Sequence, residues 1–279
     1  MINTALPGLD QAPVPPSPRT VGVRALVRQR PLLTFFVLSC LVSWWPAVVA
    51  AFGSSEGGLA GFGPFVAAVV VLALTQGWSG VKDLLSRMIK WRVGPRAYLV
   101  AFGIPIVITA VVILLTIATG AAMPSAAALG AWTQIPLMVA LMLLIPGMGG
   151  AWEEPGFRGF ALGRLEERFG LSAAPLLLGA FWVVWHLPLF LNGAILLTDV
   201  LVILAVSVVI AAVYHSARDS VLIAMLLHAT NNALGGEFAR QLFTGSDAAR
   251  LGVFVAAAWV LLATAVIVRQ RRRRGSRKG

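Results

Sequence analysis

The sequence predicts an all-α, polytopic membrane protein with about eight transmembrane helices. Of its 279 residues, 58% are hydrophobic and 12% are charged, whereas soluble domains contain roughly 45–50% apolar and about 25% charged residues. Several apolar stretches reach the length of about 20 residues that a helix needs to cross a bilayer. The run over 65–74 shows no alternation of apolar and polar residues, which disfavours a transmembrane β-barrel.

Eight apolar stretches are candidate membrane spans. They cover residues 31–52, 60–77, 97–121, 134–152, 171–191, 196–215, 219–235 and 250–268. With a cytoplasmic N-terminus, this layout leaves 20 of the 22 Lys and Arg residues on the cytoplasmic side, and only Arg240 and Arg250 outside. The positive-inside rule predicts this asymmetry. We therefore expect a multi-pass protein of the plasma membrane with both termini in the cytoplasm.

The spans divide the chain into three regions. Residues 1–30 are Pro-rich with scattered Arg, and we expect a disordered cytoplasmic segment without a cleavable signal peptide. Residues 31–268 form the transmembrane helical domain, and residues 269–279 form a basic cytoplasmic tail. Because the tail is juxtamembrane, its charge is suited to anionic lipid head groups. The net charge of +11 therefore requires no nucleic-acid partner.

Polar residues inside or at the edge of three apolar stretches carry the functional signal. Glu153 and Glu154 follow the fourth span, His186 lies in the fifth, and His228 and Asn232 lie in the seventh. An ionisable group in hydrocarbon costs several kcal/mol, so it usually lines a cavity and has a partner. Three segments that each supply such groups predict one shared polar site within the membrane, with a core region at about 150–235.

The two acids have two interpretations. Glu154 and Arg158 are four residues apart, in the order that favours a helical ion pair, which leaves Glu153 to face another direction. Alternatively, the acids belong to a hydrated helix end at the cytoplasmic surface. By helical rise, His228 lies roughly 13 Å and His186 roughly 22 Å from the cytoplasmic end of their spans, deeper than Glu153. A helix break at the Pro and Gly residues of 146–150 would be one way to reconcile these depths.

The two histidines also have helical partners. Trp182 precedes His186 by four residues, and Asn232 follows His228 by four, so each pair projects from one helix face. Either pair alone fits a structural hydrogen bond. Together, a glutamate, two imidazoles and an amide fit hydrolysis of an amide bond, in which a histidine and a glutamate deprotonate water and His228 and Asn232 stabilise the oxyanion. No Ser or Cys is evidently paired with the histidines, which disfavours a covalent acyl-enzyme.

At these residues the chain resembles the CAAX-protease and bacteriocin-processing (CPBP, or Abi) family of intramembrane proteases. The family motif Glu-Glu-x-x-x-Arg is matched by Glu153, Glu154 and Arg158. The motif of an aromatic residue, three others and His is matched by Trp182 and His186, with Trp in place of the usual Phe. The motif His-x-x-x-Asn is matched by His228 and Asn232.

The resemblance implies cleavage of peptide bonds in membrane-associated substrates. Glu153 with His186 would activate water, and Glu154, Arg158 and Trp182 would be the structural support of the site. Family substrates include CAAX-type prenylated and bacteriocin-like peptides. We expect a metal-free, glutamate-dependent mechanism; Glu153, His186 and His228 would be the ligands if zinc is bound. A non-catalytic membrane immunity or binding protein and a proton-coupled transporter are the alternative functions. The oligomeric state is left open.

Overall fold

The computed structural model describes residues 22–53 and 57–275, and these residues contain helices and connecting loops but no β-strand. The predicted all-α fold class is confirmed. In chain order the elements are α1 (Val23–Gln29), α2 (Pro31–Ala51), α3 (Gly63–Gln76), α4 (Trp78–Met88), α5 (Pro95–Ala118), α6 (Ala126–Gly130), η1 (Ala131–Gln134), α7 (Ile135–Leu144), η2 (Gly150–Glu153), α8 (Glu154–Gly156), η3 (Phe157–Leu162), α9 (Gly163–Phe169), α10 (Ala174–Trp185), α11 (Leu187–Leu191), α12 (Asp199–Ser216), α13 (Val221–Asn231), η4 (Asn232–Phe238), η5 (Ala239–Gln241) and α14 (Gly245–Gly275).

Five helices of the described chain are long and apolar enough to cross a membrane. They are Pro31–Ala51, Pro95–Ala118, Ala126–Leu144, Asp199–Ser216 and Gly245–Arg273. The predicted spans over 60–77, 171–191 and 219–235 also contain apolar helices, but α3, α10 and α13 have only 14, 12 and 11 residues. The fifth predicted span is divided at His186, and the seventh continues from α13 into the π-helix η4.

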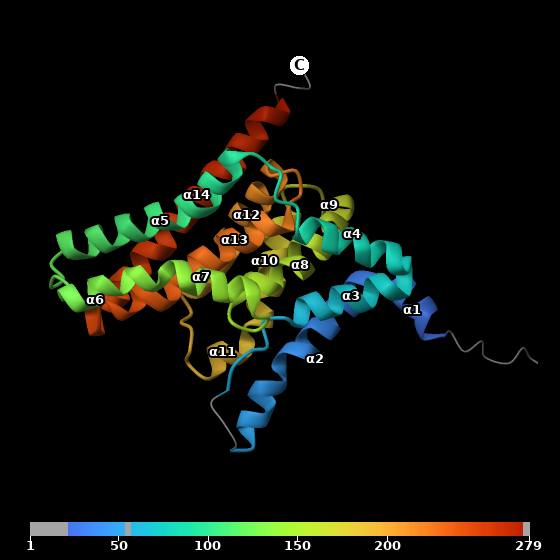
Figure 1. Cartoon of the computed structure of the whole chain (residues 1–279), viewed down its shortest axis with the longest axis horizontal. Coiled ribbons are helices and arrows are strands. Elements are labelled where there is room, and N and C mark those ends of the chain that lie inside the picture. Colours follow the sequence, from blue (N-terminus) through green and yellow to red (C-terminus); the bar gives the residue numbers. More distant parts are fainter. Residues whose placement is uncertain (1–21, 54–56, 276–279) are drawn as a thin grey trace, which may run out of the picture.

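Helix α13 forms the centre of the bundle. It packs against α5, α7 and α12 (Figure 1), and nine of its eleven residues are buried. Ser220 caps its start, because the Ser220 hydroxyl accepts a hydrogen bond from the Ile223 backbone N–H. A helix that is apolar on every side is expected in such an interior position. The central position of α13 places His228 inside the protein rather than against lipid.

The fourth predicted span differs most from the structure. The helix starts earlier, at Ala126, and ends at Leu144. Gly147 and Gly149 then have φ values of 95° and 108°, which favour glycine, and they turn the chain into the second helical segment η2–α8–η3–α9. Residues 153–162 in this segment are all buried. The acids therefore do not lie at a hydrated helix end, and the alternative interpretation of Glu153 and Glu154 is wrong.

The two ends of the chain also differ from the predicted boundaries. Residues 23–29, which were expected to be disordered, form α1, and Val27 in this helix is buried. The rest of the predicted disordered segment, residues 1–21, lies outside the described residues. At the other end, α14 continues to Gly275, so residues 269–275 of the predicted basic tail extend the last helix, and residues 276–279 lie outside the described residues.

Polar contacts gather at both ends of the bundle. At one end, Arg240 pairs with Asp199 (2.7 Å) and Arg250 donates to the Thr119 carbonyl (2.6 Å). At the other end, His215 of α12 contacts Glu166 of α9 at 2.7 Å and Asp219 at 2.8 Å. Arg240 and Arg250 are the two basic residues that the predicted layout places on the opposite side of the membrane from all the others. The structure places both at the same end of the bundle, as that layout requires.

Candidate active site

Trp182 is the residue around which the predicted site assembles. It lies in the last turns of α10 and is 3% exposed. Its indole Nε1 donates a 2.6 Å hydrogen bond to Oε2 of Glu153, and its ring centroid lies 5.7 Å from that of His186 and 5.1 Å from that of His228. The carboxylate and both imidazoles, which come from three separate segments, thus surround one indole.

Glu153 reaches this depth because of the turn after α7. The turn over 145–149 is largely exposed, and η2, which follows it, carries the Glu153 side chain toward α10. Glu153 is 5% exposed. A buried carboxylate requires a hydrogen-bond donor, and the Trp182 indole supplies one. The Gly-containing break therefore reconciles the depths of the acid and the histidines.

His186 lies at the carboxyl end of α10, where the helix stops at Trp185. Its Nδ1 is 2.8 Å from the backbone carbonyl oxygen of Trp182. Because a carbonyl oxygen only accepts hydrogen bonds, Nδ1 carries the proton. In the neutral ring the lone pair is then on Nε2, which is the form that a general base needs.

His228 is held by the second glutamate. Its Nδ1 lies 2.7 Å from Oε1 of Glu154. The same oxygen accepts a 2.9 Å bond from Arg158, which is the ion pair predicted from the four-residue spacing. The side chains of Glu154 and Arg158 have no exposed surface. A buried charge requires compensation, and here Arg158 balances Glu154 while Glu154 orients His228.

Ser207 completes the support of Arg158, and sequence reasoning missed it. One guanidinium nitrogen of Arg158 donates to the Ser207 carbonyl (3.2 Å) and to its hydroxyl (3.3 Å). The Ser207 hydroxyl in turn donates to the carbonyl of Pro175 at 2.8 Å. Ser207 is a small polar residue in the middle of the apolar helix α12 and belongs to no motif, so the sequence held no signal beyond its polarity.

Gly150 gives His228 the space that its ring occupies. A Cβ atom at this position would overlap with the His228 ring, with Nε2 as its nearest atom. This contact between Gly150 and His228 was not predicted from the sequence. The Nε2 side of His228 therefore faces the turn that leads to Glu153.

We expect Gly150→Ala to lower any hydrolytic activity at least about 100-fold, while protein stability falls by about 1–3 kcal/mol, the usual cost of overpacking. The added methyl group would turn the His228 ring away from Glu154. Gly163→Ala is the matched control, because a Cβ atom at Gly163 meets nothing within 4 Å. Activity and thermal unfolding of both variants would be measured in detergent. An active Gly150→Ala protein would contradict this account of the ring position.

Asn232 is less closely joined to the site than the other predicted residues. It follows His228 by one helical turn and begins η4. The hydrogen bond recorded for its side chain comes from Asn231, whose Nδ2 lies 3.5 Å from Oδ1 of Asn232. Within the described ranges, this amide has no hydrogen bond to Glu153, His186 or His228. Its role at the oxyanion stays a prediction.

The fold and this site define a class: a polytopic all-α membrane protein with a buried glutamate and two histidines at its centre. Comparisons with known proteins agree with the motif resemblance. Residues 131–234 match the family described as type II CAAX prenyl endopeptidase Rce1-like. A relative in Methanococcus maripaludis, "CAAX prenyl protease 2", is 25% identical over 216 residues, which is 70% of this chain and 79% of the relative. These matches agree with the resemblance of the chain to the CPBP family of intramembrane proteases.

Proposed function

We propose that the protein is an intramembrane endopeptidase that hydrolyses peptide bonds of membrane-associated substrates. The observation that carries this proposal is the convergence of Glu153 and His186 on Trp182, with His228 against the same indole. Peptide hydrolysis needs a base for water and donors for the oxyanion. The match to type II CAAX prenyl endopeptidases over 131–234 supports the same reaction class.

Glu153 and His186 are the proposed base system. Both are fixed by Trp182, Glu153 through the indole N–H and His186 through the backbone carbonyl. Glu153 accepts the proton of the attacking water, while the Nε2 lone pair of His186 positions the water or relays the proton to the leaving amine. Because burial keeps bulk water away from these groups, their electrostatic effect on the reaction is enhanced.

His228 and Asn232 are the proposed oxyanion donors. For His228 to donate from Nε2 while Nδ1 bonds to Glu154, the ring must be the imidazolium, and the buried Glu154 carboxylate stabilises that cation. The Asn232 amide N–H₂ group supplies the second donor. Arg158 and Ser207 hold Glu154 in place and thereby fix the direction of the His228 ring.

We propose that Glu153, His186 and His228, the zinc ligands considered from the sequence, act without a metal ion. Across residues 22–53 and 57–275, no three His, Cys, Asp or Glu residues are placed so that they could hold a metal ion together. In addition, Oε2 of Glu153 accepts from the Trp182 indole. The proposed mechanism therefore uses the side chains alone.

We expect treatment of the purified protein with a chelator to leave its peptidase rate unchanged. The reason is that water activation is assigned to Glu153 and His186 rather than to a metal. Elemental analysis before and after chelation would accompany the rate measurement. A stoichiometric zinc ion whose removal abolishes turnover, and whose return restores it, would contradict the metal-free mechanism.

The test of the proposed function is a comparison of membrane peptides in cells that contain either the active protein or a folded, inactive variant. Peptides that accumulate only with the active protein identify substrates and cleavage positions. The purified protein in liposomes should then cut synthetic peptides of the same sequence. If no membrane peptide differs between the two cell populations and the purified protein cuts none, the proposed function is wrong.

A further inference from the structure

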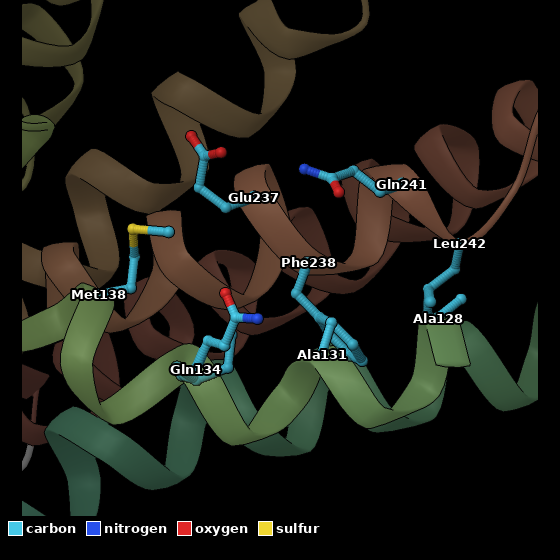
Figure 2. A pocket seen from close by; sticks show the side chains of 9 residues that line it. Ala128, Ala131, Gln134, Met138, Glu237, Phe238, Gln241 and Leu242 are labelled. Atoms are coloured by element: carbon cyan, nitrogen blue, oxygen red, sulfur yellow. The ribbon is translucent and has the colours of Figure 1, made fainter. Parts of the chain in front are cut away.

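A second candidate site lies between η1–α7 and η4–η5. It is a cavity of about 180 Å³ with apolar walls, and its polar lining residues are Gln134, Glu237 and Gln241. Figure 2 shows Gln134 and Met138 on one wall, Glu237 and Gln241 on the other, and Phe238 extending toward Ala131. Pockets for small-molecule ligands usually measure about 300–1,000 Å³. This cavity is suited to a single side chain.

Glu237 differs from the other acids at this end of the bundle. Asp199 pairs with Arg240 at 2.7 Å, and Asp247 pairs with Arg250 at 3.5 Å. Glu237 is exposed and has no hydrogen bond or ion pair within the part of the chain that the structure describes. Its negative charge is therefore available to a ligand that enters the cavity.

The cavity is joined to the proposed catalytic site by the two elements that form its walls. On α7, Met138 lines the cavity and Met142, one turn on, lies against Gly149, next to the glycine that contacts His228. On the other wall, η4 begins at Asn232 and carries Glu237. The axial distance from His228 to Glu237 is at most about 13 Å, the rise of nine helical residues. An extended peptide covers this distance with about four residues.

We infer that this cavity selects a basic side chain, lysine or arginine, of the peptide substrate. The apolar walls fit the methylene stem, which such side chains commonly bury. The amide oxygens of Gln134 and Gln241 accept hydrogen bonds from its charged end, and Glu237 supplies the opposite charge. The selected residue lies two to four positions from the scissile bond. This inference rests on the proposed function, and it adds the substrate class.

The test compares peptide cleavage by the wild-type protein with cleavage by Glu237→Gln and Glu237→Lys in liposomes. A synthetic library varies the four positions on each side of the cut among Lys, Arg, norleucine and Glu. At one position the wild type should prefer Lys or Arg to norleucine by about fivefold in kcat/KM, the effect of a partly exposed charge pair. Glu237→Gln should remove this preference, and Glu237→Lys should transfer it to Glu.

The control is Glu167→Gln, which removes an exposed carboxylate of α9 and should leave the preference unchanged. The inference is overturned if the wild type shows no preference, or if both Glu237 variants keep it. Binding of a fluorescent lysine peptide to Glu153→Gln, with and without Glu237→Gln, separates this result from the proposed function. If no peptide is cleaved, weaker binding of the lysine peptide to the Glu237→Gln protein still supports the cavity assignment. Equal affinity with and without Glu237→Gln overturns it.

Discussion

Glu153→Gln is expected to reduce peptide hydrolysis by two to four orders of magnitude, the usual contribution of a general base. The amide has nearly the same shape as the carboxylate, and its oxygen can still accept the hydrogen bond from the Trp182 indole. What the variant loses is the ability to take a proton from water. The measurement is kcat/KM on a liposome-reconstituted peptide substrate, together with thermal unfolding to show that the protein remains folded.

Glu166→Gln provides a matched control for this result. Glu166 is also a glutamate that contacts a histidine, His215, at 2.7 Å, but it lies on α9 near the end of the bundle. We expect this variant to keep its hydrolytic activity. A folded Glu153→Gln protein with wild-type kcat/KM would end the assignment of Glu153 as the base, and would favour a binding protein that uses the same fold.

Arg158→Ala is expected to lower the free energy of unfolding by about 3–5 kcal/mol, the cost of leaving a buried charge without its partner. Glu154 would keep its charge in an environment without exposed surface. Activity should fall as well, because Glu154 orients His228. Unfolding in detergent, followed by circular dichroism, measures the first effect, and peptide cleavage measures the second.

Two further variants separate the loss of stability from the loss of activity. Arg158→Lys keeps the charge but lacks the planar fork with which Arg158 reaches both Glu154 and Ser207, so we expect only part of the stability to return. The double variant Glu154→Gln/Arg158→Met removes the charge pair altogether, and it should be more stable than Arg158→Ala yet weakly active. An Arg158→Ala protein as stable as the wild type would contradict the role of the buried ion pair.

Most of the fold could be predicted from apolar run length, since a bilayer sets the length of a spanning helix. The segment after α7 could not. Its residues 153–162 include two glutamates and an arginine, which in isolation indicate a solvated helix end, but all are buried in the structure. Burial of Glu154 and Arg158 is possible because the two side chains form an ion pair in the folded protein. Ser207, which also binds Arg158, is 49 residues away in the sequence, so no local sequence pattern indicates this contact.

The residues of the candidate site were predicted, but the contacts between distant segments were not. Spacing of four residues predicted the pairing of Glu154 with Arg158 because both lie on one helix. The contacts of Glu153 with Trp182 and of Glu154 with His228 cross 29 and 74 positions of the sequence. Sequence periodicity does not link such distant residues. The different partners of the two neighbouring glutamates, Trp182 for Glu153 and His228 for Glu154, could therefore be identified only from the structure.

The indole at position 182 stands where phenylalanine is usual in the family that the chain resembles. A benzyl ring has no N–H group to offer, so relatives with phenylalanine must satisfy their corresponding acid by some other donor. Exchange of this one aromatic residue between relatives should therefore be poorly tolerated unless a second position changes with it. Sequence comparison across such proteins should find the aromatic residue and that compensating donor varying together.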